Sequence, residues 1–165
     1  MLPPARTPGT YRIELVCLGN ICRSPTAHVV LEARLVEAGL DEVTVTSSGT
    51  GDWHVGNPMD RRAAATLTAA GYDASRHRAR QWAGPDEVDL SLAMDADNLH
   101  DIGGPGERTR LFRTFDPMVA AGEPGADVPD PYYGGDSGFE EVLAMVDRTA
   151  AALVDELRAH GDQDS

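Results

Sequence analysis

The sequence predicts an α/β fold, a three-layer sandwich in which helices cover both faces of a parallel β-sheet. Strand-like and helix-like segments alternate along the chain. The first strand-like segment also ends in a nearly continuous apolar run, which is typical of a buried parallel strand. We find no internal repeat and no shift in composition that would mark a domain boundary. The 165 residues, 41% of them hydrophobic, therefore predict one domain over 1–165, with an ordered core at about 10–160 and flexible termini.

The first strand is predicted over 11–19, "YRIELVCLG", where alternation gives way to the apolar run. The first helix is predicted over 24–40, "SPTAHVVLEARLVEAGL". Ser24 suits its N-cap, Pro25 its first turn and Gly39 its end. Its main apolar residues fall on one helical face: Ala27, Val30, Leu31 and Leu35.

The middle of the chain continues the alternation. The β-branched run "EVTVTSSG" (42–49) predicts a second strand. "NPMDRRAAATLTAAGY" (57–72) predicts a helix that begins near the Asn-Pro pair and ends before glycine. "EVDLSLAMD" (87–95) predicts a third strand, and "ADNLHDIGG" (96–104) a short helix behind it.

The C-terminal third predicts a fourth strand at "TRLFRTFD" (109–116). The segment 116–138 is rich in proline and glycine and predicts a long loop, which in a compact domain is usually functional or disordered. "FEEVLAMVDRTAAALVDELRAH" (139–160) predicts a long amphipathic helix. We expect the tail, 161–165, to be frayed.

Composition excludes several classes of partner. The net charge is -13, so we expect no nucleic-acid partner and no anionic membrane partner. All 14 cationic side chains are arginine, so any phosphate must be bound by arginine and backbone N–H groups. The five histidines are scattered without ligand spacing, and we expect no metal site.

Cysteine content and the N-terminus predict a soluble, cytoplasmic protein. Two cysteines do not make a disulfide scaffold, and residues 1–10 lack the apolar core of a signal peptide. No apolar run approaches the roughly 20 residues of a membrane span. Export by a route that needs no such signal stays open.

The segment "CLGNICRS", residues 17–24, joins the carboxyl end of the first strand to the first helix, where ligands bind in such folds. Consecutive N–H groups of this loop, with the positive end of the helix, can form a nest for a dianion such as phosphate. Gly19 and Asn20 tolerate the left-handed backbone that a nest needs. Arg23 can grip two phosphate oxygens with its planar guanidinium group.

Both cysteines lie in this loop, and Cys17 would sit at the bottom of the nest. An isolated cysteine is more often a small buried packing residue. Here a helix N-terminus and Arg23 favour the thiolate, and Ser24 can donate a hydrogen bond to it. The arrangement therefore predicts in-line attack of Cys17 on phosphorus, with a phosphocysteine intermediate.

The motifs "CLGNICRSP", "SSGTGDWHVGNPMDRRA", "HRAR", "AMDADN" and "DPYYGG" span most of the chain. On these motifs the sequence resembles the low-molecular-weight protein tyrosine phosphatases of the bacterial type. The resemblance implies a four-stranded parallel sheet in the order 2-1-3-4, helices on both sides, no metal and no cofactor. It also implies phosphotyrosine-containing proteins as substrates. We expect a monomer, with weak self-association left open.

The resemblance also implies roles for single residues. Cys17 would be the nucleophile and Arg23 the phosphate clamp, while Asn20 holds the loop and Ser24 stabilises the leaving thiolate. Asp130 would be the general acid and base. The phosphate-binding segment comprises Leu18, Gly19, Asn20, Ile21, Cys22, Arg23 and Ser24.

Two aspartates compete for the role of general acid, because Asp116 and Asp130 are each followed by proline. From the residues alone the choice is even, since Asp-Pro is often just a turn. The "YYGG" after Asp130 matches the family and favours Asp130. An acid is needed because a phenolate, with a pKa near 10, departs far better when it is protonated.

Further residues are expected around the cleft. Trp53, His54, Tyr132 and Tyr133 would form its walls, although each could be a structural side chain. Asp95 and His77 would support the loop. Cys22 could join Cys17 in a reversible disulfide, as the resemblance also implies, or could simply be a packing residue.

Three functions besides tyrosine phosphatase activity stay open. A related class removes phosphate from arginine but resembles this loop with threonine at the position of Ile21. Arsenate reductases of the same fold use additional cysteines, which this chain lacks outside positions 17 and 22. A non-catalytic phosphotyrosine-binding module would need a broken Cys17, Arg23 or Asp130, and all three are present.

Overall fold

The computed structural model describes residues 2–122, 125–132 and 134–164. Its strands are β1 Tyr11–Cys17, β2 Val43–Gly49, β3 Leu90–Ala93 and β4 Thr109–Leu111. Its helices are α1 Arg23–Ala38, α2 Arg61–Ala69, α3 Ala96–Asp101, the 3₁₀ helix η1 Phe112–Phe115, α4 Pro117–Ala120 and α5 Asp136–Asp164.

The four strands form one parallel sheet in the order β2-β1-β3-β4, which confirms the predicted fold class and strand order. The central strand β1 pairs with both of its neighbours. Its last residue, Cys17, lies opposite Gly49 of β2, and Val16 lies opposite Ala93 of β3. The carboxyl ends of three strands therefore meet at one edge of the sheet, directly below the loop that leaves β1.

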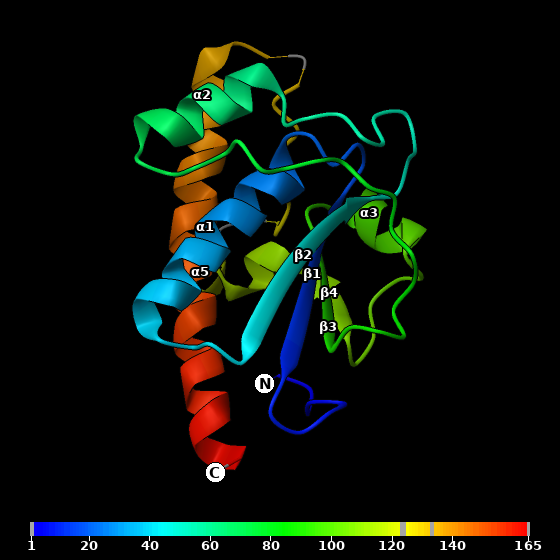
Figure 1. Cartoon of the computed structure of the whole chain (residues 1–165), viewed down its shortest axis with the longest axis vertical. Helices are drawn as coiled ribbons and strands as arrows, with labels where there is room; N and C mark the ends of the chain where they lie inside the picture. Colours follow the sequence, from blue (N-terminus) through cyan, green and yellow to red (C-terminus); the bar gives the residue numbers. More distant parts are fainter. Residues whose placement is uncertain (1, 123–124, 133, 165) are drawn as a thin grey trace.

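Helices cover the sheet on both sides, as Figure 1 shows. Helices α1 and α5 lie side by side on one face, with α2 packed against the beginning of α5, and α3 lies against β3 and β4 on the other face. The predicted apolar face of α1 is buried throughout its length, from Ala27 to Leu35. It packs on the central strands, where Ile13 and Leu15 of β1 are fully buried. Burial of such side chains contributes about 1.5–3 kcal/mol each.

Several predicted elements start or end elsewhere, and two of the differences have a local cause. The fourth strand stops at Leu111, and the rest of its predicted range is η1, in which the Thr114 hydroxyl bonds the Leu111 carbonyl oxygen at 2.7 Å. Helix α2 begins at Arg61 rather than near Asn57, because the Asp60 carboxylate caps the first backbone N–H groups of the helix.

The segment 116–138, predicted to be a loop, contains helical residues at both ends. Asp116 caps the short helix α4, and α5 begins at Asp136 and continues to Asp164, beyond the predicted 139–160. Residues 161–164, expected to be frayed, thus extend α5. At the other end of the chain, Leu2 is buried and the Tyr11 hydroxyl bonds the Pro3 carbonyl oxygen at 2.9 Å. Within the described ranges, no helix is both long and apolar enough to cross a membrane.

Candidate active site

The loop between β1 and α1 has the left-handed residue that a nest requires. Asn20 has a φ of 56°, as predicted, whereas Gly19 does not adopt a positive φ. A Cβ atom at position 19 would lie 3.1 Å from Cδ2 of His54, a close contact that the imidazole ring would have to relieve by a small shift. The helix begins earlier than predicted, with Cys22 rather than Ser24 at the N-cap. Ser24 lies inside the first turn, and its hydroxyl serves the loop instead.

Asn20 is fully buried and fixes the loop from below. Its Nδ2 donates to Ser24 Oγ at 2.8 Å and to Ser47 Oγ at 3.1 Å, and its Oδ1 accepts the backbone N–H of Arg80 at 2.9 Å. His77 Nε2 donates to the Asn20 carbonyl oxygen at 2.6 Å, which gives His77 the supporting position expected for it. Two segments distant in sequence, the end of β2 and residues 77–80, therefore hold one loop residue.

The end of β2 approaches the loop closely at Gly49. A Cβ atom on Gly49 would lie 2.7 Å from the Leu18 carbonyl oxygen and 3.1 Å from the Asn20 nitrogen. Only glycine therefore lets the strand support the loop at this distance.

Cys17 Sγ lies within hydrogen-bond distance of two donors. Ser24 Oγ is 3.0 Å away, and the Asn20 backbone N–H donates to the sulfur at 3.2 Å. Because Ser24 Oγ already accepts from Asn20, its single hydrogen points either to Sγ or to the Ser48 carbonyl oxygen at 3.3 Å. A negatively charged sulfur would draw that hydrogen to itself, which is the environment of a thiolate nucleophile.

The remaining loop amides are available to a ligand. Among the described residues, none accepts a hydrogen bond from the backbone N–H of Gly19, Ile21 or Cys22. Buried or half-buried N–H groups are normally paired with protein or water, so such a set in one turn is a site for an anion.

Arg23 lies beside these amides and is held rigidly. Its Nη1 donates to Asp95 Oδ2 at 2.5 Å and to the Val128 carbonyl oxygen at 3.1 Å, and its Nη2 is 3.6 Å from Asp130 Oδ2. Burial by itself would lower the pKa of Arg23, but Cys17, Asp95 and Asp130 outweigh it and raise the pKa. Asp95 also caps α3 through a backbone N–H, so one carboxylate joins the helix to the arginine.

These groups surround a cleft of about 340 Å³ at the carboxyl edge of the sheet. It is lined by Cys17, Leu18, Gly19, Ile21, Cys22, Arg23, Trp53, His54, Asp130 and Tyr132. Of the other predicted site residues, Asn20 and Ser24 are buried beneath the loop, and Tyr133 lies outside the described residues. Trp53, with 69% of its surface exposed, and Tyr132, with 39%, present apolar walls to the solvent.

Known proteins are similar to this chain over most of its length. Residues 12–163 match the model of the family described as low molecular weight phosphotyrosine protein phosphatase. The chain belongs to this family. It is 46% identical to a low molecular weight protein-tyrosine-phosphatase of Streptomyces coelicolor, over 90% of this chain and 94% of the relative. It is 44% identical to low molecular weight protein-tyrosine phosphatase A of Mycobacterium tuberculosis, over 87% and 89%.

Solved structures of the family have the same fold. The crystal structure of a protein tyrosine phosphatase from Entamoeba histolytica, with Hepes in its active site, superposes with a TM-score of 0.83 at 28% identity. The match covers 92% of this chain and 99% of that one. The fold found here is thus also the fold of a solved protein tyrosine phosphatase.

The two competing aspartates of this phosphatase-family chain lie in different environments. Asp130 lines the cleft and is 39% exposed. Asp116 is completely buried, accepts bonds from Arg113 and Arg148 and caps α4. Burial would raise the pKa of Asp116, but the bonds from Arg148, Met118 N–H and Arg113 lower it to about 2. Asp116 is therefore an ionised structural residue, and Asp130 is the candidate acid.

Replacement of Asp116 with asparagine is expected to destabilise the protein by about 3–5 kcal/mol, because it removes the buried carboxylate that pairs with both Arg113 and Arg148. The lowered pKa of Asp116 also predicts that the free energy of unfolding decreases in acid. Its contribution of roughly 2 kcal/mol is complete above pH 4, where the unfolded state is also ionised, and is lost as pH falls to about 2. Urea unfolding between pH 2 and 7 measures both effects. If acid lowered the free energy of unfolding equally in wild type and in Asp116→Asn, this assignment would be contradicted.

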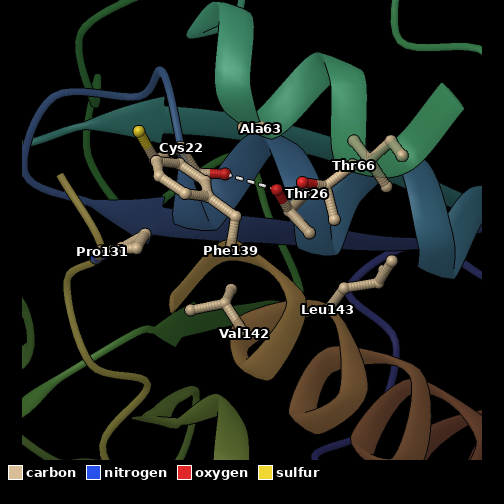
Figure 2. Close-up of a pocket in the computed structure, with 9 residues that line it drawn as sticks. Cys22, Thr26, Ala63, Thr66, Pro131, Phe139, Val142 and Leu143 are labelled. Atoms are coloured by element: carbon tan, nitrogen blue, oxygen red, sulfur yellow. Dashed lines mark hydrogen bonds between the residues drawn. The ribbon is translucent and has the colours of Figure 1, made fainter. Parts of the chain in front are cut away.

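The second cysteine faces a different environment from the first. Cys22 borders the cleft and also a packed group from α1, α2 and α5, shown in Figure 2 with Phe139 extending from α5 toward it. Burial raises the pKa of the Cys22 thiol, and the carboxylates of Asp60 and Asp130 raise it further. Cys22 is thus a protonated thiol at neutral pH. Both cysteines are free in this structure, and a redox role for Cys22 stays a prediction.

Some functional contacts were missed in the sequence. Ser47, the Arg80 backbone N–H and the Val128 carbonyl oxygen all orient loop residues. Two of the three are backbone atoms, for which no residue type is a signal. The third, the Ser47 side chain, lies in the motif "SSGTGDWHVGNPMDRRA". Among the described residues, no group of three histidine, cysteine or acidic side chains could hold a metal ion.

Proposed function

We propose that this protein hydrolyses phosphotyrosine in proteins through a phosphocysteine intermediate. One observation carries the proposal. The Cys17 sulfur accepts the Asn20 N–H and lies 3.0 Å from the Ser24 hydroxyl oxygen. It shares the cleft with loop amides that have no acceptor among the described residues, and with an arginine and a carboxylate that are 3.6 Å apart. Family membership implies phosphoprotein substrates, and the finer assignment to phosphotyrosine rests on the shape of the cleft.

In the first step, the phosphate dianion binds the free N–H groups of the loop and the Arg23 guanidinium group. Arg23 needs no reorientation, because Asp95 and the Val128 carbonyl oxygen already hold one of its nitrogens. The Cys17 sulfur forms a bond to phosphorus while the bond from phosphorus to the tyrosine oxygen breaks. Asp130 gives its proton to that oxygen, so the leaving group departs as a neutral phenol.

In the second step, water attacks phosphorus and the bond from sulfur to phosphorus breaks. The Asp130 carboxylate accepts a proton from the water, and inorganic phosphate leaves. The electron pair returns to Cys17, where the Ser24 hydroxyl and Asn20 N–H stabilise the thiolate again. The enzyme is regenerated without metal or redox partner.

The cleft favours an aromatic leaving group. Trp53 and Tyr132 form its outer walls, and Ile21 and Leu18 are apolar parts of its floor and rim. A flat ring can stack on such walls. A guanidinium leaving group would find a polar partner at position 21 only if threonine replaced Ile21, so we rank phosphoarginine second.

Arsenate reduction and phosphotyrosine binding without turnover are less well supported. Arsenate reduction would need a resolving thiol outside the loop, and the chain has only two cysteines. A phosphotyrosine-binding module without activity would need no general acid, whereas here the Asp130 carboxylate lies 3.6 Å from Arg23 in the cleft.

The proposal is tested by comparing turnover of para-nitrophenyl phosphate, a phosphotyrosine peptide and a phosphoarginine peptide by the purified protein. We expect hydrolysis of the first two, with kcat/KM for phosphotyrosine at least tenfold above that for phosphoarginine. Binding without turnover would favour the module, and the opposite ranking would favour an arginine phosphatase.

The expectations about domain organisation, localisation, oligomeric state and nucleic-acid binding are also proposals. We propose that residues 1–165 act as one domain, as a cytoplasmic monomer without a nucleic-acid partner. The net charge of -13 supports the last point. Light scattering during size-exclusion chromatography measures the molar mass in solution and so tests whether the protein is a monomer.

A further inference from the structure

The candidate acid lies on residues 129–135, which we call the acid loop. The described residues of this segment make few hydrogen bonds to the rest of the protein. It follows Val128, which is buried and donates its N–H to the Met94 carbonyl oxygen at 2.7 Å. Within the described part of the acid loop, every residue except Pro131 is exposed. Exposed segments with few buried contacts open easily, so the place of Asp130 over the cleft depends on specific contacts.

One side chain from another element contacts this loop at two backbone positions. Arg62, on the first turn of α2, donates from Nη2 to the Tyr132 carbonyl oxygen at 2.8 Å and from Nη1 to the Gly134 carbonyl oxygen at 3.4 Å. The two carbonyl groups flank position 133. The fixed fork geometry of a guanidinium group suits two acceptors at once.

The guanidinium group is itself held in place by α2 and α5. Asp60, the N-cap of α2, accepts from Arg62 Nε and Nη2 at 3.4 Å. The Arg62 guanidinium carbon lies 4.6 Å from the ring centroid of Phe139 and 5.6 Å from that of Tyr132. Phe139 is buried in the group of Figure 2, beside Pro131 and Cys22. The arginine thus joins two helices to the acid loop.

The Tyr132 peptide leads directly to the acid. The Tyr132 backbone N–H donates to Asp130 Oδ1 at 3.0 Å, which leaves Oδ2 on the side of Arg23, 3.6 Å from Nη2. Any shift of residue 132 would therefore rotate the carboxylate relative to Arg23 and Cys17. A misplacement of about 1 Å at a reacting group can cost up to roughly 100-fold in rate.

We infer that Arg62 is a positioning residue for the general acid: by holding the Tyr132 and Gly134 carbonyl groups against α2, it keeps the Asp130 carboxylate aimed at the leaving-group oxygen. The inference rests on the proposed function and assigns a role outside the phosphate-binding loop. Arg62 does not line the cleft and makes no hydrogen bond to Cys17, so we infer that it acts through Asp130.

The test compares two substrates that differ in their need for an acid: a phosphotyrosine peptide and 2,4-dinitrophenyl phosphate, whose leaving group is already acidic. Arg62→Ala is expected to lower kcat roughly tenfold for the peptide and less than about twofold for the dinitrophenyl ester. Arg62→Lys keeps the charge but cannot bind two carbonyl groups in one plane, so we expect the same selective loss.

Two controls separate positioning from general damage. Arg61→Ala removes the neighbouring arginine of the same helical turn, which is exposed and makes no ion pair with any described residue, and it should leave both rates unchanged. In the Asp130→Ala background, Arg62→Ala should cost nothing further, because the acid that it positions is gone. Thermal unfolding verifies that each variant is folded.

Equal losses on both substrates, full rescue by Arg62→Lys, or losses that multiply in the double variant would each overturn the inference. A wild-type protein that hydrolyses neither substrate would instead refute the proposed function. A wild type whose Asp130→Ala variant shows the selective loss, while Arg62→Ala does not, would refute the role of Arg62 alone.

Discussion

Replacement of Cys17 with serine is expected to lower turnover of para-nitrophenyl phosphate by at least about 10⁴-fold while phosphate binding is retained. A serine hydroxyl stays protonated at neutral pH, and the loop offers no base that would remove its proton: Asn20 N–H is a donor and Ser24 is a hydroxyl. The binding groups are the backbone amides and Arg23, and the substitution leaves them unchanged.

Turnover and binding are measured on the same variant. Calorimetric titration with inorganic phosphate should give a dissociation constant within about threefold of wild type. Residual activity above about one per cent would mean that another group attacks phosphorus. Loss of phosphate binding would mean that the sulfur is needed to shape the loop, and the variant would then say nothing in favour of a nucleophilic role.

Replacement of Asp130 with alanine is expected to lower kcat for a phosphotyrosine peptide by about 10²-fold, because the phenolate must then leave unprotonated. For 2,4-dinitrophenyl phosphate the loss should be below about tenfold. Asp130→Asn gives a matched variant, since its side-chain oxygen can still accept the Tyr132 N–H but has no proton to transfer. It should behave like the alanine variant.

Asp116 provides the contrast for this experiment. Asp116→Asn lowers stability, but the folded enzyme should keep the wild-type ratio of rates on the two substrates, because Asp116 is buried beside Arg113 and Arg148 and not in the cleft. A substrate-dependent loss in Asp116→Asn rather than in Asp130→Ala would reverse the assignment of the acid.

Local signals explain what could be predicted from the sequence. The first strand, the loop and the first helix are contiguous, so the apolar run before Cys17 and the periodicity from Ala27 to Leu35 were sufficient to place the loop at the carboxyl edge of the sheet. The αL conformation of Asn20 followed from the short polar side chain of asparagine.

Long-range contacts explain what could not be predicted. From the residues alone the two Asp-Pro pairs look alike, and only the family motif "DPYYGG" favoured Asp130. The structure adds a physical distinction, because Asp116 is buried between arginines. Ser24 is a good N-cap by residue type, but the loop's bond to Asn20 moves the helix start so that Cys22 takes that place. The fourth strand ends early because the Thr114 hydroxyl bonds the Leu111 carbonyl oxygen, a local competition that alternation does not reveal.

The distant partners of the buried Asn20 have a consequence for biosynthesis. Positions 47, 77 and 80 must all be in place before the turn that carries the reactive sulfur takes its final shape, and the arginine beside it is oriented by residues 95 and 128. A chain emerging from the ribosome therefore lacks this arrangement around its sulfur until residue 128 has been translated and the domain has folded. The catalytic arrangement is completed only with the tertiary structure. Incomplete or unfolded copies should therefore not hydrolyse the phosphorylated proteins around them.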